Sequence, residues 1–141
     1  GNAVFVAAML ELPTMAFFSK MSEKINCGTL IKFSILMFCV KHALTYFATN
    51  MIMIYLAQVC QMFAYALFIP ASVYYVNEKI ALADRVKGQS LVTTSMTLSG
   101  VFANFAGGIM LDALGVGHVL LAGIILSIVG AVIVILTTEK V

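Results

Sequence analysis

Charged residues are scarce in this sequence, and tryptophan is absent. Of the 141 residues, 10% are Asp, Glu, Lys or Arg, whereas a soluble domain typically contains about a quarter. Hydrophobic residues make up 62% of the chain, and its mean hydropathy is +1.08. A soluble domain of this size exposes too much surface for such a composition, so the sequence excludes a soluble globular fold.

Metal-binding and catalytic motifs are lacking as well. Cys27, Cys39 and Cys60 show no metal-ligand spacing, so we interpret them as small buried hydrophobic residues without a disulfide framework. The sequence contains no GxSxG, HExxH, P-loop or GxGxxG motif. We therefore expect no metal, no cofactor and no enzymatic activity. The short cationic loops do not favour a nucleic-acid partner.

The amino end shows no sign of a removable signal peptide. The chain begins at Gly1, directly in an apolar stretch, with no basic region before it and no small-residue cleavage site after it. We therefore expect the sequence to be a fragment of a longer chain.

Long apolar runs fill the rest of the sequence. A transmembrane helix needs about 20 apolar residues, because the hydrocarbon core is about 30 Å thick and a helix rises about 1.5 Å per residue. The sequence predicts an all-α polytopic membrane protein with five transmembrane helices, at residues 1–18, 29–48, 51–76, 88–111 and 118–137. A turn from Asp112 to Gly117 is expected between the last two.

Cationic residues gather in alternate loops. The first and third loops and the tail contain them, whereas the second and fourth loops have none. Because cationic loops stay cytoplasmic, we predict a plasma-membrane protein with its amino end outside and its carboxyl end in the cytoplasm. A preceding span would complete a six-helix bundle, which again indicates a fragment. The cations of these loops and their borders are Lys20, Lys24, Lys32, Lys79, Arg85, Lys87 and Lys140.

Small residues recur at every fourth position on the last two predicted helices. Such stripes let helix backbones approach closely, so they predict packing faces. The alternative is that small residues are simply frequent in transmembrane helices. The two stripes are Ser99, Ala103 and Gly107, and Gly123, Ser127 and Ala131.

Three polar residues are predicted near the membrane midplane. Glu11 lies about 13 Å from the cytoplasmic boundary, Lys41 about 18 Å from the same side, and Gln61 about 16 Å from the outer side. A charged group at this depth is costly unless it faces protein or water. Glu11 and Lys41 are therefore interpreted as a charge pair in an aqueous cavity, where Glu11 takes up a proton and Lys41 binds an anionic group. The alternative is a buried ion pair that only fixes helix packing.

The third predicted helix carries a polar stripe. Gln58, Gln61 and Tyr65 share one helix face, either as a cavity lining or as partners in interhelical hydrogen bonds. Pro70 removes a backbone donor and is expected to kink this helix. His42 is interpreted as a satisfied or interfacial histidine rather than a ligand.

Other polar and aromatic positions are given structural interpretations. Asn104 is expected to make hydrogen bonds between helices. Tyr74 and Tyr75 are expected to lie in an aromatic belt at the membrane surface.

Several stretches together resemble a known transporter family. They are residues 11–20 (ELPTMAFFSK), Lys41 within CVKH, residues 61–68 (QMFAYALF), residues 74–76 (YYV) and residues 84–89 (DRVKGQ). The chain is similar to the last five helices, spans eight to twelve, of a major facilitator superfamily transporter. The closest likeness is to the branch that includes lactose permease, nucleoside–proton symporters and phenylpropionate permeases.

This resemblance implies a twelve-helix protein whose two halves rock around a central site, which gives alternating access. The sequence departs from that branch at Gln61, where a histidine is common, and at Ala64 or Ala66, where a carboxylate is common. Proton coupling would then depend on Glu11 or on an acid in the other half.

We expect secondary transport of a small polar solute such as a sugar, a nucleoside or an aromatic acid. The lipid bilayer and the missing amino-terminal half of the same chain are the other expected partners. The alternative is a truncated or stand-alone membrane protein that acts in interaction or assembly without transport.

Overall fold

The computed structural model describes Phe18 and residues 25–139. This part of the chain contains four α-helices and one short 3-10 helix, and no strand occurs in it. Each of the four α-helices is long and apolar enough to cross a membrane, which confirms the all-helical class and four of the five predicted helices. The predicted first helix, apart from Phe18, lies outside the described residues. In chain order the elements are α2 (Cys27–Tyr46), α3 (Met51–Lys79), η1 (Leu82–Asp84), α4 (Arg85–Leu114) and α5 (Val116–Thr137).

The loop between α2 and α3 is short and ends at a capping residue. The Asn50 side chain accepts a hydrogen bond of 3.0 Å from the backbone N–H of Met53, which satisfies one of the free donors at the start of α3. The helix then continues through Pro70 and ends at Lys79, three residues beyond the predicted boundary. The predicted kink at Pro70 stays a prediction.

The turn between α4 and α5 is shorter than predicted. The expected six-residue turn from Asp112 to Gly117 is wrong, because α4 continues to Leu114 and α5 begins at Val116. Gly115 alone reverses the chain, with a φ of 80°. Glycine adopts this left-handed conformation without the steric cost that a Cβ atom imposes, so one residue suffices for the turn.

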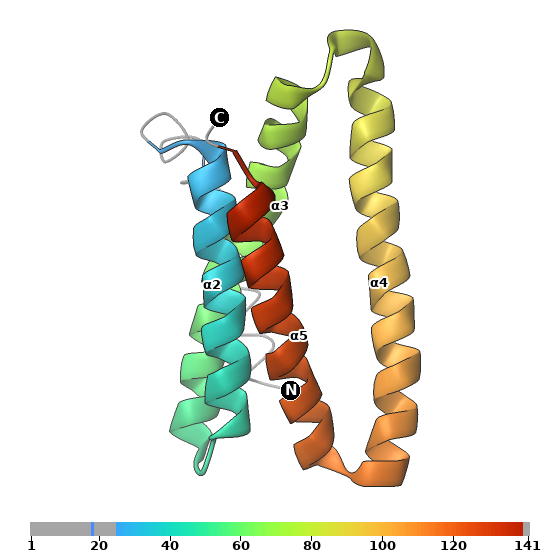
Figure 1. Ribbon diagram of the computed structural model, residues 1–141. Helices are drawn as coiled ribbons and strands as arrows, with labels where there is room; N and C mark the ends of the chain where they lie inside the picture. Colours follow the sequence, from blue (N-terminus) through green and yellow to red (C-terminus); the bar gives the residue numbers. More distant parts are fainter. Residues whose placement is uncertain (1–17, 19–24, 140–141) are drawn as a thin grey trace.

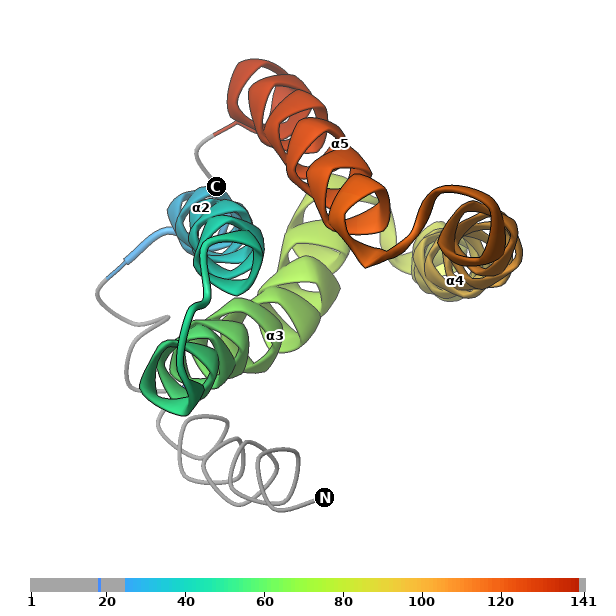
Figure 2. The same cartoon turned by 90° about the horizontal axis from the view of Figure 1, so that it is seen from below.

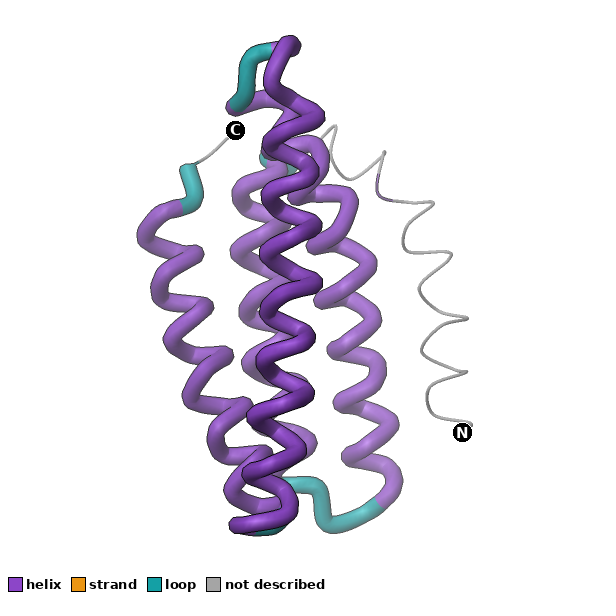
Figure 3. Tube along the Cα trace, turned by 90° about the vertical axis from the view of Figure 1, so that its right-hand side faces the viewer, coloured by secondary structure: helices purple, strands orange, loops and turns teal. Residues whose placement is uncertain are grey.

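Helices α2, α3 and α5 form a packed group, and α4 stands apart from it (Figures 1 and 2). The buried cluster of this group comprises Phe18, Leu30, Ile31, Leu67 and Ala71. Helix α4 has no buried residue. The helices lie side by side with their connections at two opposite ends (Figure 3), as expected for segments that cross a bilayer.

The small-residue stripe of α5 packs against α2 as predicted. A Cβ atom on Gly123 would lie 3.1 Å from the His42 ring, and the Cys39 thiol donates a hydrogen bond of 3.2 Å to the carbonyl of Ser127. Ala131 is 5% exposed. Dispersion contacts at such close approaches hold helices together in lipid.

Among the described residues nothing packs on the matching stripe of α4, so that prediction is wrong for this part of the chain. Ser99 and Ala103 are exposed, and no described atom lies within 4 Å of a Cβ placed on Gly107. Because α4 is separated from the packed group along its middle, its small residues leave open space beside them. That space contains the cavities described below.

Candidate functional site

One cavity lies between α2, α4 and α5, and we call it the Lys41 cavity. It has a volume of about 310 Å³. Helix α2 contributes its polar wall, with Lys41, His42 and Thr45. Helices α4 and α5 contribute small and aliphatic side chains, among them Gly107 and Gly123. The cavity therefore combines one cationic side chain with a largely apolar lining.

The polar side chains of this wall differ in how well their hydrogen bonds are satisfied. The Thr45 hydroxyl donates 2.8 Å to the carbonyl of Lys41, within the helix. The His42 Nδ1 lies 2.7 Å from the carbonyl of Phe38; because a carbonyl only accepts, Nδ1 carries the proton. This satisfied histidine agrees with the interpretation from the sequence. Lys41 is half-buried, and among the described residues no carboxylate forms an ion pair with it.

The structure fixes the position of Lys41 along α2, whereas its predicted depth near the membrane midplane stays a prediction. Helix α2 ends at Tyr46, five residues after Lys41, so Lys41 lies about 8 Å along the axis from that end. The sequence placed the end of this helix at residue 48 and Lys41 near the midplane. The N–H of Phe47, the residue after the helix, still bonds to the carbonyl of Ala43 at 3.0 Å, as the last helical hydrogen bond. Lys41 therefore lies in the last third of α2.

A second cavity lies between α2, α3 and α4, and we call it the Tyr65 cavity. Its volume is about 440 Å³. The Tyr65 ring meets the Phe38 ring edge to face, with centroids 4.8 Å apart and planes at 78°. The α4 side of this cavity includes Ser95, Ser99 and Ala103, and Ala103 also lines the Lys41 cavity. The two cavities therefore adjoin along the small-residue stripe of α4.

The structure brings some of the predicted site residues together and separates others. Lys41 and Tyr65 line adjoining cavities. Gln58 and Gln61 are half-buried on α3 and belong to the lining of neither. Glu11 lies outside the described residues, so its pairing with Lys41 stays a prediction.

The sequence interpretation missed the part that α4 plays in the site. The stripe of α4 was expected to pack against another helix, yet it lines both cavities. A signal was present, because Ser95 precedes this stripe by one helical turn and extends it with a second hydroxyl group. Asn104, expected to bond between helices, is exposed on α4.

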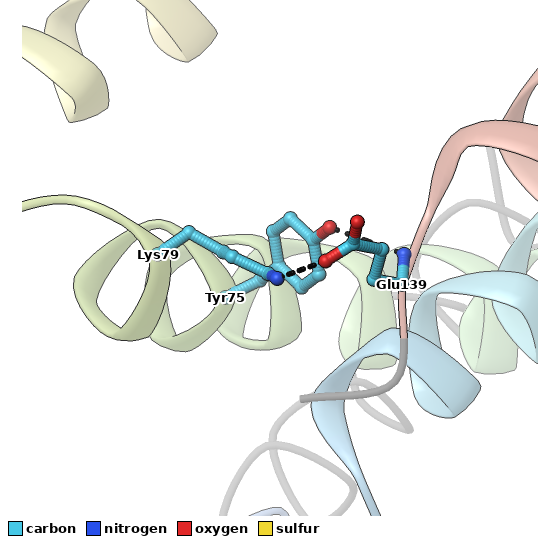
Figure 4. A network of polar contacts seen from close by, with 3 residues as sticks. All are labelled: Tyr75, Lys79 and Glu139. Carbon is cyan, nitrogen blue, oxygen red and sulfur yellow. Dashed lines mark hydrogen bonds and ion pairs between the residues drawn. The ribbon is translucent and has the colours of Figure 1, made fainter.

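The ends of three helices meet at a cluster that we call the terminal clasp, formed by Gly28, Tyr75, Lys79 and Glu139. Lys79 and Glu139 form an ion pair, and the backbone N–H of Glu139 donates 3.3 Å to the Tyr75 hydroxyl (Figure 4). The hydrogen bond from Lys79 lowers the pKa of Glu139. Gly28 lets the chain after α5 pass closely, because a Cβ there would clash with the Glu139 carbonyl oxygen.

Tyr74 and Tyr75, which were expected in an aromatic belt, differ from each other in burial and in contacts. Tyr75 is half-buried and takes part in the clasp. Tyr74 is exposed and its ring lies 5.6 Å from that of Phe18. Tyr75 therefore has a packing role in addition to any contact with the membrane surface.

Comparison with known proteins gives one match. A family model described as Major Facilitator Superfamily matches residues 1–141. No curated protein and no solved structure matches the chain.

Proposed function

Because this chain belongs to the major facilitator superfamily, we propose that it is part of a secondary transporter that moves a small polar solute across the plasma membrane by alternating access. Membership supports transport of a small solute by a multi-pass membrane protein. The finer assignments proposed here are the carboxyl-terminal half, spans eight to twelve, and likeness to the lactose permease branch. The proposed orientation has the amino end outside and the carboxyl end in the cytoplasm, with the amino-terminal half of the same chain completing the path.

The observation that carries this proposal is the half-buried Lys41 beside a cavity of about 310 Å³ between three membrane-crossing helices. A cation inside a membrane is costly unless it faces water, protein or a ligand. The adjoining Tyr65 cavity extends the same space along α4. Lys41 and Tyr65 are the proposed solute contacts, and Gln58 and Gln61 would join them if α3 turned toward α4 during transport. Glu11 is the proposed site of proton coupling.

Uptake measurements in cells or proteoliposomes test the proposal with the full-length protein. Lys41→Ala is expected to weaken solute uptake, while Lys32→Ala on the same helix serves as a control because Lys32 does not line the Lys41 cavity. Glu11→Gln is expected to abolish gradient-driven accumulation while the protein stays in the membrane. Unchanged accumulation in Glu11→Gln would refute proton coupling through this residue, and equal uptake in both lysine variants would refute the solute role of Lys41.

An assembly role without transport is the second candidate. It is favoured by the exposed face of α4, which has no buried residue and which an associating helix would cover. Absence of uptake by the full-length protein, together with a stable complex of defined stoichiometry in mild detergent, would favour this candidate over transport.

A further inference from the structure

A third cavity lies at the opposite end of α4 from the turn at Gly115. It has a volume of about 490 Å³ and lies between the end of α3 and the start of α4. Six of its seven lining residues have polar side chains, in a chain whose residues are 62% hydrophobic. None of these seven residues lines the Lys41 cavity or the Tyr65 cavity.

The chemistry of this third cavity is that of an anion site. Arg85 lines it and is half-buried. Its Nε lies 3.5 Å from the carbonyl of Ile80, which leaves the two terminal amino groups of the guanidinium for another acceptor. In the described part of the chain, Lys79 and Lys87 each pair with a carboxylate, whereas Arg85 does not. A guanidinium binds phosphate through two parallel hydrogen bonds, which a lysine does not match.

The other polar lining groups come from both helices. The Gln89 amide donates 2.9 Å to the carbonyl of Val73 and 3.5 Å to the side-chain oxygen of Asn77, which holds α4 against α3. Asn77 lines the cavity from α3, and Ser90 and Thr94 line it from α4. Hydroxyl and amide N–H groups can donate hydrogen bonds to the oxygens of a phosphate ester. No carboxylate is found among the described residues that line the cavity, so nothing there would repel an anion.

The position of the cavity favours a lipid headgroup as the phosphate-bearing ligand. Helix α4 has 30 residues, so it is about 45 Å long, whereas the hydrocarbon core is about 30 Å thick. The end with Arg85 and Lys87 therefore extends into the headgroup region. Val86, in the cavity wall, is 77% exposed and neighbouring Leu82 is 78% exposed, which provides apolar surface for acyl chains beside the polar groups.

We propose that this cavity binds the phosphate headgroup of an anionic phospholipid, with Arg85 as the principal contact and the side-chain amide of Asn77 as a supporting donor. On the orientation proposed above, the cavity faces the cytoplasmic leaflet, where anionic lipids gather and where basic pockets between helices bind them. The bound lipid would join the ends of α3 and α4. This site is separate from the solute path, so its test does not depend on transport.

Native mass spectrometry of the detergent-solubilised full-length protein tests this proposal. The protein is titrated with dioleoyl phosphatidylglycerol, dioleoyl phosphatidylcholine or glycerol 3-phosphate. We expect phosphatidylglycerol to bind at least about tenfold more tightly than phosphatidylcholine, equivalent to about 1.4 kcal/mol, because the choline cation of phosphatidylcholine cancels the net negative charge that Arg85 attracts. Equal binding of the two lipids would overturn the proposal. Binding of glycerol 3-phosphate as tight as that of phosphatidylglycerol would overturn the lipid assignment in favour of a soluble phosphate ester.

Matched variants test whether the preference for phosphatidylglycerol over phosphatidylcholine arises in this cavity. Arg85→Gln is expected to abolish this preference. Lys87→Gln is expected to keep it, because Lys87 pairs with Asp84 at 2.7 Å and does not line the cavity. Both variants remove one positive charge, so an equal loss in both would mean nonspecific attraction and would refute the site. Asn77→Leu keeps the charge and approximate size and is expected to weaken phosphatidylglycerol binding about fivefold. If Arg85→Gln does not fold, unchanged binding in Asn77→Leu refutes the proposal by itself.

Discussion

Replacing Gly28 by alanine tests the terminal clasp most directly. An ideal Cβ at this position would clash with the carbonyl oxygen of Glu139. The neighbouring atom is backbone, so no side-chain rotation relieves the clash. The chain after α5 must therefore move away from α2, and this movement strains the contacts of Glu139 with Tyr75 and Lys79.

Two effects of Gly28→Ala oppose each other. Alanine is favoured over glycine in a helix by up to about 1 kcal/mol, whereas overpacking a close contact costs about 1–3 kcal/mol. We expect the overpacking cost to prevail, so the melting temperature of the purified protein should fall. The matched control is Gly100→Ala in α4, where no atom lies within 4 Å of the new Cβ. That variant gains the helix preference alone, and its melting temperature should rise slightly.

The labelling of Cys27 provides a local readout of the same change. Cys27 is 4% exposed and precedes Gly28 in α2, so a displaced terminal segment should admit a thiol reagent. In a background with Cys39→Ala and Cys60→Ala, we expect Gly28→Ala to speed labelling about tenfold, the equivalent of about 1.4 kcal/mol in local opening. If Gly28→Ala instead raised the melting temperature as Gly100→Ala does, and left labelling unchanged, the close approach of Glu139 would be refuted.

Two further predictions concern the clasp and the cavities. The lowered pKa of Glu139 means that its pairing with Lys79 stabilises the clasp above the ordinary carboxyl value of 4.5, and that this contribution is lost as the pH falls through the lower, folded-state pKa. The melting temperature of the wild type should therefore fall as the pH drops below 4.5, while that of Glu139→Gln is already lowered at neutral pH; identical melting temperatures of the two proteins across this pH range would contradict the pairing. Gly107→Leu should fill part of the Lys41 cavity and reduce solute uptake in the full-length protein, because Gly107 lines that cavity and its Cβ position is open. Gly130→Leu, also open but outside the cavity lining, should transport normally, and equal uptake in the two variants would show that the cavity is not on the solute path.

Much of the helical framework could be predicted from the sequence alone. Apolar runs longer than a membrane is thick allow few structures other than helices, because backbone groups in lipid must bond within their own segment. The predicted start of the third helix at residue 51 agrees with the structure, where the Asn50 side chain satisfies a free backbone donor of α3. The likeness to the major facilitator superfamily rested on local stretches of sequence, and the family match over residues 1–141 confirmed it at the level of the superfamily.

Only the tertiary structure decided which face of each helix packs against a neighbouring helix and which face stays open. In lipid, an apolar side chain is satisfied whether it faces a neighbouring helix or the acyl chains, so hydropathy does not distinguish a packed face from an open one. The stripes of α4 and α5 look alike in sequence. Yet a Cβ on Gly123 would lie 3.1 Å from the His42 ring, whereas no described atom lies within 4 Å of one on Gly107. The absence of Gln61 from the lining of the Lys41 cavity and the close approach of Glu139 to Gly28 depend in the same way on where whole helices lie, which no local pattern specifies.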